Sequence, residues 1–290
     1  MTALAVAAGR AVETTRPDAL AADPFAAALV AGARSNLDLP TVWPADPTAA
    51  PALQQPLLLA STYIGLRTRF IDDFLQSEPQ DLQTVILGAG LDTRVYRLKW
   101  PPGSRVLELD HANVLEFKAA VMEGLSAKPA CHLITVPTDL AQPWENALLT
   151  AGYDRQQPTT WIIEGLLPYL SADAQLATLQ EVAALSPSGS RAVIERAVPL
   201  PATEEVEAKL REFSAQTGLP MSELLARANP PDPVRLLEAA GWECREHPIP
   251  ELCARYGRAI SLTTPDGLAS DGSHDRSRGG FVTAWLPRRA

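Results

Sequence analysis

The chain is poor in the residues that build metal sites and disulfide frameworks. Among its 290 residues there are three cysteines and four histidines. The cysteines form no C-x-x-C pair, and no two histidines stand at the spacing of metal ligands on one helix. An odd number of scattered cysteines fits a reducing compartment, so we expect a cytoplasmic protein without a structural zinc ion.

Basic residues and long apolar runs are also scarce. Twenty-five lysines and arginines against 34 acidic residues leave a net charge of −9. Nucleic-acid binding needs clustered positive charge, so this balance argues against a nucleic-acid partner. No apolar stretch approaches the roughly 20 residues that span a bilayer, and the alanine-rich start lacks the basic residues of a signal peptide. We expect no membrane partner, and the sequence indicates no oligomeric state.

Strands and helices alternate through the middle of the chain. Apolar runs predict strands at 84–88, 105–110, 131–140, 159–165 and 190–196. Helical stretches lie between these runs, which implies right-handed crossovers and a mainly parallel sheet. Two further runs, at 243–249 and 279–286, predict closing strands. The fold class is therefore α/β, with a Rossmann-like sheet and helices on both of its faces.

Helical segments precede and interrupt this alternation within what we interpret as a single domain, 1–290. Residues 1–75 form an N-terminal helical cap in this interpretation. Asp23-Pro24 is placed to start its second helix, and the amphipathic pattern at 57–75 predicts another helix. Residues 203–228 contain two polar helical patterns with no strand between them, so we interpret residues 196–232 as a lid insertion. Glycine, serine and aspartate at 264–280 predict a loop.

Glycines and acids follow the predicted strands where each strand ends. Gly88 and Gly90 follow the first, Asp110 ends the second, Asp139 follows the third and Glu164 the fourth. The carboxyl ends of parallel strands meet at one edge of the sheet, where α/β proteins bind ligands. Asp110 stands 22 residues after Gly88, close to the roughly 20 that separate a glycine turn from an acid that binds ribose. The pattern predicts a nucleoside site.

The residues after the glycines favour one nucleoside ligand over another. A dinucleotide site prefers a third glycine beside the pyrophosphate, but Thr93 stands there and Asp92 precedes it. A carboxylate is unfavourable beside a pyrophosphate and favourable beside an ammonium and a sulfonium. The pattern thus favours S-adenosylmethionine over NAD. A nicotinamide-dependent oxidoreductase remains an alternative, although no Tyr-x-x-x-Lys pattern is present, and so does a non-catalytic S-adenosylmethionine-binding protein.

Several stretches together resemble the leucine carboxyl methyltransferase family. They are, in chain order, "RAVETTRPDALAADPFAA", "YIGLRTRFIDDFL", "VILGAGLDTRVYRL", "LELDHANVLEFK", "TDL" and "WIIEGLLPYLS". The similarity is greatest to its bacterial branch of S-adenosylmethionine-dependent O-methyltransferases, which includes polyketide carboxyl methyltransferases. It covers roughly residues 3–200. The resemblance implies a class I methyltransferase fold.

The resemblance also assigns the methionine and ribose parts of the cofactor to the first two strand ends. It implies that Gly88, Ala89 and Gly90 line the methionine part of S-adenosylmethionine, with Thr93 nearby. It implies further that Asp110 accepts hydrogen bonds from the ribose hydroxyls. These roles are expectations for the structure.

The remaining roles fall on later strands and on the N-terminal helices. The resemblance implies that Asp139 receives the adenine amine while Leu140 packs on the ring. Glu164 would lie beside the ammonium or the sulfonium. Arg67, with Arg10 as a second partner, would hold the carboxylate of the cofactor. From the residues alone, Arg67 could instead lie along a solvated helix face, and Asp139 could cap the helix after it.

The methyl acceptor is less well defined. We expect a small acid such as a polyketide acid, because a carboxylate is ionised at neutral pH and needs no general base. A peptide C-terminus is a further candidate, and a phenol or an alcohol acceptor would need a base. Tyr169 either contacts the substrate or covers the core. We assign no catalytic residue.

Overall fold

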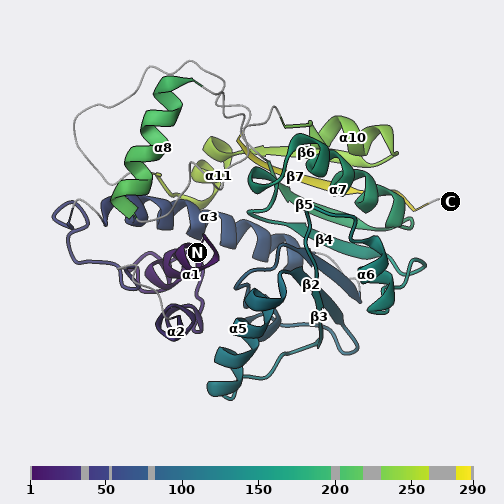
Figure 1. Cartoon of the computed structure of the whole chain (residues 1–290), viewed down its shortest axis with the longest axis horizontal. Helices are drawn as coiled ribbons and strands as arrows, with labels where there is room; N and C mark the ends of the chain where they lie inside the picture. The colour runs from purple at the N-terminus through teal and green to yellow at the C-terminus, as the bar shows by residue number, and fades with distance from the viewer. Residues whose placement is uncertain are drawn as a thin grey trace.

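A seven-stranded sheet in the order β3-β2-β1-β4-β5-β7-β6 runs through the molecule (Figure 1). The computed structural model describes residues 2–33, 39–51, 54–77, 82–196, 203–217, 230–260 and 279–288. Its strands are β1 (Gln83–Leu87), β2 (Arg105–Asp110), β3 (His132–Pro137), β4 (Thr159–Ile163), β5 (Arg191–Glu195), β6 (Glu243–Pro248) and β7 (Gly280–Trp285). Strands β1 to β5 pair in parallel, whereas β7 is antiparallel to both of its neighbours.

Helices occupy most of the segments between these strands. In chain order they are α1 (Thr2–Thr14), α2 (Ala26–Gly32), α3 (Gln55–Gln76), α4 (Arg94–Arg97), α5 (Ala112–Gly124), α6 (Glu145–Thr150), the 3₁₀ turn η1 (Leu167–Tyr169), α7 (Ala172–Leu185), α8 (Glu204–Thr217), α10 (Pro233–Ala239) and α11 (Ile249–Tyr256). No helix among the described residues is long and apolar enough to cross a membrane.

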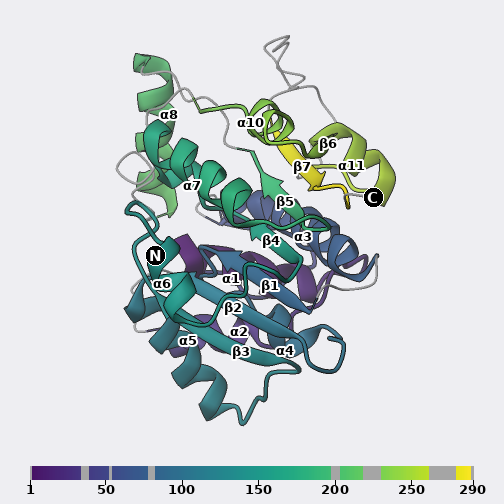
Figure 2. The same ribbon diagram turned by 90° about the vertical axis from the view of Figure 1, so that its right-hand side faces the viewer.

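The two faces of the sheet carry separate hydrophobic cores. Side chains alternate along each strand, so Val85 and Leu87 face one core and Ile86 faces the other. The first core is closed by α6, α7 and α10, and the second by α3, α4 and α11 (Figure 2). The predicted α/β fold, with a mainly parallel sheet covered on both faces, is confirmed.

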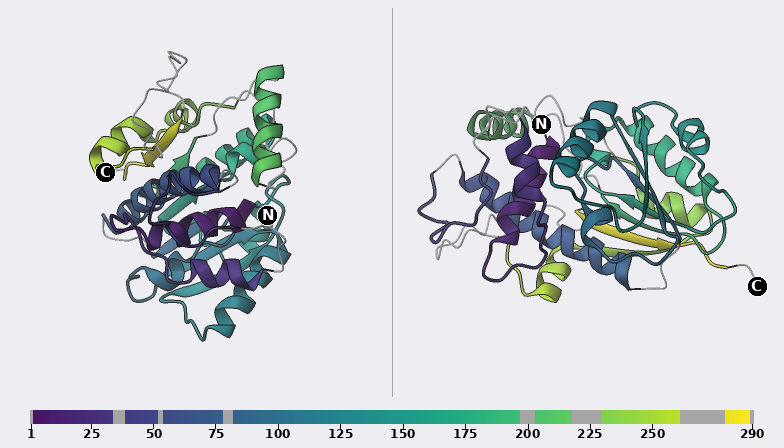
Figure 3. Two further views of the ribbon diagram at one scale, coloured as in Figure 1. Left: turned by 90° about the vertical axis from the view of Figure 1, so that its left-hand side faces the viewer. Right: turned by 90° about the horizontal axis from the view of Figure 1, so that it is seen from below.

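The N-terminal helices pack beside the sheet, with α1 lying between α3 and α2 (Figure 3). A third apolar cluster joins Ala7 of α1 and Leu29 of α2 to Leu91 and Met122. Further along α1, buried Glu13 accepts hydrogen bonds from Arg258 at 3.0 and 3.2 Å. Arg258 follows α11, so the beginning of the chain is tied to a segment close to its end.

One predicted helix begins at a different residue in the structure, and two predicted elements lie wholly or mostly outside the described residues. Helix α2 begins at Ala26 with Phe25 as its N-cap, while Asp23 accepts the Phe25 amide at 3.0 Å from just outside the helix. Helix α8 is the first of the two predicted polar helices. The second, and most of the predicted loop at 264–280, lie outside the described residues.

Helix α11 was not predicted from the sequence. It has only eight residues, with a proline in its first turn and Gly257 in the left-handed conformation at its C-terminus. Proline and glycine at these two positions are ordinary helix boundaries. With only eight residues, the segment is shorter than the window over which helical periodicity is recognised in a sequence.

Candidate functional site

The carboxyl ends of the parallel strands open onto a cavity of about 660 Å³, a volume typical of cofactor sites. Nine of the ten residues that we assigned to the cofactor line it: Arg10, Arg67, Gly88, Ala89, Gly90, Asp110, Asp139, Leu140 and Glu164. Tyr169 also lines it. Thr93 does not, because it is buried and its hydroxyl donates to Asp23 at 2.7 Å.

The glycine turn after β1 wraps around the end of β2. Gly88 and Gly90 have φ values of +69° and +50°, in the region that glycine enters without strain. The amides of Gly88 and Ala89 both donate to the Leu109 carbonyl, at 2.9 and 3.0 Å. The turn is therefore held open towards the cavity by hydrogen bonds to the neighbouring strand.

Asp110 is the acid at the end of β2, and its carboxylate is fixed by two backbone amides. Oδ2 accepts the Gly90 amide at 2.7 Å, and Oδ1 accepts the His111 amide at 2.7 Å. Each carboxylate oxygen has a second lone pair. The carboxylate can thus hold the glycine turn and still accept hydroxyl groups from a ligand in the cavity.

Replacement of Asp110 by alanine should weaken S-adenosylmethionine binding by roughly tenfold or more, because charge-assisted hydrogen bonds are worth ~1.5–3 kcal/mol. Calorimetric titration measures the change. Asp110→Asn is the matched control for shape, since its amide oxygen still accepts one of the two backbone bonds. Affinity equal to that of the wild type in the alanine variant would move the ribose contact to another residue.

Asp139 and Leu140 lie at the other end of the cavity, after β3. Asp139 is exposed, and its Oδ1 accepts the Ala141 amide at 2.9 Å. The alternative that Asp139 caps the next helix is wrong, because α6 begins at Glu145 with Trp144 as its N-cap. Leu140 is buried and offers an apolar wall. This end of the cavity combines an available acceptor with an apolar surface.

Arg67 is buried between two carboxylates and does not lie along a solvated face. Its Nε is 2.8 Å from Glu164 Oε1, and its Nη1 donates to Glu195 Oε2 at 3.0 Å. Glu195 also accepts the Gly165 amide at 2.7 Å and the Tyr63 hydroxyl. The described ion pairs and hydrogen bonds of Arg67 use Nε and Nη1.

A second buried arginine, Arg94, binds the carboxylates beneath the site. Its Nη1 is 2.6 Å from Glu164 Oε2 and also contacts Asp92, and its Nε donates to Asp72 at 2.7 Å. Burial acts to raise the pKa of Asp92, but the charge and backbone amide of Arg94, together with the charges of Lys118 and Arg97, outweigh it and lower that pKa to about 2. Burial likewise acts to raise the pKa of Glu164, but the charges of Arg94 and Arg67 reverse this effect, so that pKa is lowered. Both acids are ionised at neutral pH.

Arg10 lines the cavity and is held by Asp23 and by Leu91. Its Nε donates to Asp23 at 2.7 Å and its Nη2 to the Leu91 carbonyl at 2.5 Å. Asp23 also accepts the Thr93 hydroxyl. These contacts fasten α1 to the loop after β1, which gives Arg10 and Thr93 a part in holding the cavity wall.

The sequence prediction missed Arg94 and Glu195. Glu195 ends β5, so the strand-end rule that located Asp110 and Glu164 also applies to it. Arg94 follows two residues after Asp92, and only the fold shows that it reaches Asp72 and Glu164. Among the described residues, no group of three metal-ligating side chains comes together.

The charge of the cavity selects among ligands. Four carboxylates and two guanidinium groups line it, so its lining carries an excess of negative charge. A ligand with an excess of positive charge is favoured there, and one with a pyrophosphate is disfavoured.

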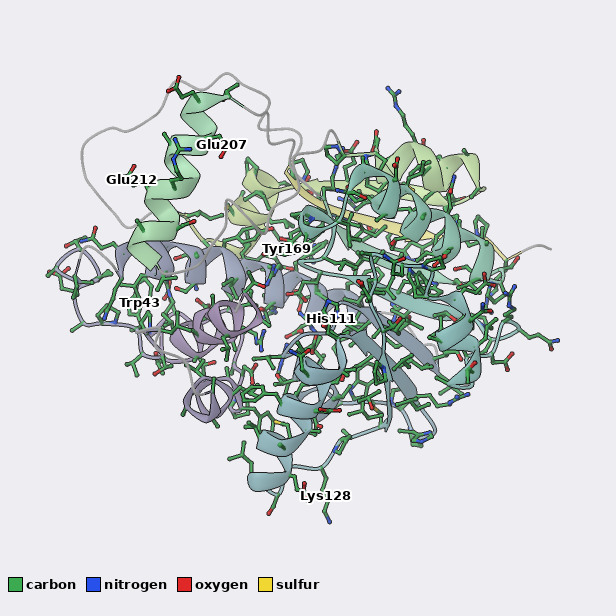
Figure 4. The ribbon with its side chains drawn as sticks, in the orientation of Figure 1. Trp43, His111, Lys128, Tyr169, Glu207 and Glu212 are labelled. Carbon is green, nitrogen blue, oxygen red and sulfur yellow. The ribbon has the colours of Figure 1, made fainter. Side chains whose placement is uncertain are left out.

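Figure 4 labels His111 and Tyr169 near the meeting point of the N-terminal helices and the sheet, while Glu207 and Glu212 lie on α8.

This sheet order, with a glycine turn after β1 and an acid at the end of β2, defines a class I methyltransferase. The model of the leucine carboxyl methyltransferase family matches residues 3–183. The chain belongs to the leucine carboxyl methyltransferase family. This membership confirms the resemblance found in the sequence and sets the oxidoreductase alternative aside.

Relatives in bacteria match nearly the whole chain. A protein of Frankia alni is 38% identical over 286 residues, covering 98% of this chain and 93% of its own. A protein of Saccharopolyspora erythraea is 36% identical over 263 residues, covering 90% and 89%. Both bear the name "Putative S-adenosyl-L-methionine-dependent methyltransferase".

A solved structure shares the fold at low sequence identity. The crystal structure of a DUF574 family protein from Streptomyces avermitilis aligns with a TM-score of 0.52 at 16% identity, covering 87% of this chain and 94% of its own. At this identity the likeness shows the fold alone.

Proposed function

We propose that the chain transfers the methyl group of S-adenosylmethionine to a carboxylate oxygen of a small-molecule acid. S-adenosylmethionine is the cofactor of the family to which the chain belongs. In our proposal the glycine turn lines its methionine part, Asp110 accepts its ribose hydroxyls and Arg67 holds its carboxylate. Asp139 and Leu140 take the adenine, and Glu164 lies near the ammonium or the sulfonium.

The residues that line the cavity beside η1 support a carboxylate as the methyl acceptor. Tyr169 stands there, and burial raises the pKa of its phenol, so the hydroxyl stays protonated at neutral pH. Beside it, Thr2 and Val6 line the same region. None of these three can accept a proton at neutral pH. An acceptor that is already ionised needs no such group, whereas an alcohol does.

The reaction then follows from alignment and exclusion of water. A lone pair of the carboxylate attacks the methyl carbon, the C–O bond forms, and the C–S bond breaks with its electron pair remaining on sulfur. The products are a methyl ester and S-adenosylhomocysteine, and no proton moves. Opposite charges disappear in this step, so a dry cavity favours it over water, and positioning lowers the barrier further.

The proposal extends to the segments around the cavity. We propose that residues 1–75 form a cap and residues 196–232 a lid over the acceptor, and that the protein works in the cytoplasm. A polyketide acid, a peptide C-terminus and other small carboxylates are the candidate acceptors.

Cofactor identity is tested by thermal unfolding. S-adenosylmethionine and S-adenosylhomocysteine should raise the melting temperature, since a ligand at ~100 times its dissociation constant adds about 2.7 kcal/mol to the free energy of unfolding. NAD and NADP should leave the temperature unchanged. Stabilisation by NAD with no response to S-adenosylhomocysteine would contradict the cofactor assignment.

Release of S-adenosylhomocysteine with a library of small acids then tests the reaction. Ester products are hydrolysed by mild base and ethers are not, so the same assay separates carboxylate from hydroxyl acceptors. Cofactor binding without turnover on any acceptor would support the alternative of a non-catalytic binding protein.

A further inference from the structure

A second cavity, of about 140 Å³, lies between α1 and α3. Its walls are apolar and come from Ala5, Ala8, Val12, Leu57, Ala60 and Ile64. It shares Thr2, Val6 and Tyr169 with the large cavity. The small cavity therefore adjoins the cofactor cavity on the side where we place the methyl acceptor.

The small cavity belongs to a well-packed part of the fold. Gly9 also lines it, and a Cβ at Gly9 would lie 2.4 Å from Ile64 Cδ1, so the two helices are in direct contact there. On the same helix, Arg10 and Glu13 fasten α1 to the loop after β1 and to Arg258. The alanines of α1 and α3 thus leave space between helices that are otherwise fixed.

The chemistry of the walls limits what can bind. Among the described residues lining the small cavity, Tyr169 alone carries an ionisable group, and burial keeps its phenol neutral. A charged group would lose its hydration there without gaining a partner, which is strongly unfavourable. An apolar cavity of about 150 Å³ in another protein accepts benzene. The volume here therefore suits one six-membered ring or a short branched alkyl group.

We infer that the small cavity binds the uncharged end of the methyl acceptor. The acceptor would be a small acid whose single ring or short alkyl chain lies between α1 and α3, with its carboxylate beside Tyr169. This inference rests on the proposed function for the position of the reacting group. It adds a size for the uncharged end, because the volume of the small cavity suits a single ring better than a fused-ring system.

The test measures binding to the protein saturated with S-adenosylhomocysteine. Benzoate and benzyl alcohol are the two probes, which share a ring and differ in the carboxylate. Ala60→Leu fills part of the small cavity, and Ala120→Leu makes the same change at an exposed position of α5. Calorimetry should show both probes binding to the wild type and to Ala120→Leu, with at least tenfold weaker binding to Ala60→Leu. Affinity for S-adenosylhomocysteine should be the same in all three.

The outcomes separate this inference from the proposed function. Methylation of small acids by the wild type, with no loss of probe binding in Ala60→Leu, would overturn the cavity assignment and leave the reaction intact. Binding of both probes that is lost in Ala60→Leu, with no acid methylated, would support the cavity and contradict the carboxylate reaction. If the leucine variant fails to fold, Ala8→Val makes a smaller change, for which the same loss of probe binding is expected.

Discussion

Replacing Arg67 by lysine is expected to weaken S-adenosylmethionine binding by roughly 10- to 100-fold, since a hydrogen bond between charged groups is worth ~1.5–3 kcal/mol. Nε and Nη1 of Arg67 hold Glu164 and Glu195 at 2.8 and 3.0 Å. A lysine has a single nitrogen on a flexible stem and cannot bind both carboxylates and a ligand in this arrangement. Calorimetric titration of the two forms gives the affinity ratio.

Two controls show whether the lost contact is with the carboxylate of the cofactor. 5′-Methylthioadenosine lacks the amino-acid tail, so it should bind the wild type and Arg67→Lys equally. Arg69 lies on the same helix, is largely exposed and pairs with Asp73 at 2.8 Å, so Arg69→Lys should bind S-adenosylmethionine almost as the wild type does. Equal weakening of the tailless ligand in Arg67→Lys would make Arg67 a packing residue.

Replacing Arg94 by leucine should lower the free energy of unfolding by about 3–5 kcal/mol, the range found when one partner of a buried ion pair is removed. Arg94 is 2% exposed and contacts the carboxylates of Asp72, Asp92 and Glu164. Its loss leaves Asp92 without its main cationic partner. Denaturant unfolding measures the change, and Arg69→Leu, at an exposed pair, should cost only about 0–1 kcal/mol.

The pH dependence of this loss identifies its cause. In the wild type the pKa values of Asp92 and Glu164 are lowered. This stabilises the fold at pH values above the ordinary pKa of a carboxyl group, and the contribution is lost as the pH falls towards 2. In Arg94→Leu, burial dominates at Asp92 and raises its pKa. Protonation of Asp92 then removes the unpaired buried charge in the variant. The difference in unfolding free energy between wild type and variant should therefore shrink between pH 7 and about pH 4. A deficit independent of pH would assign the loss to packing.

The parts of the site that the sequence predicted are local ones. A glycine pair directly after an apolar run, or an acid at the last position of a strand, takes its place from the strand itself. Gly88, Gly90, Asp110, Asp139 and Glu164 were located in this way, and all of them line the cavity. Their contacts with the cofactor remain predictions.

The ion-pair network could not be predicted, because its partners are distant in sequence. Arg94 is 22 residues from Asp72 and 70 from Glu164, and Arg67 is 128 from Glu195. Each pairing exists only once α3, α4 and the sheet have packed together. From the sequence we expected the ligand to carry the positive charge that pairs with Asp92, whereas Arg94 of the protein supplies that charge.

The pairing of Glu13 with Arg258 affects the order in which the molecule can assemble. These residues are 245 positions apart, so a ribosome delivers Glu13 well before its guanidinium partner. Burying Glu13 before Arg258 arrives is less favourable, because a desolvated carboxylate then lacks its main counter-charge. Contacts between such distant residues also slow folding. We therefore expect α1 to pack in place only after Arg258 has been made, and the cavity that α1 helps to line to bind the cofactor and the acceptor only from then on.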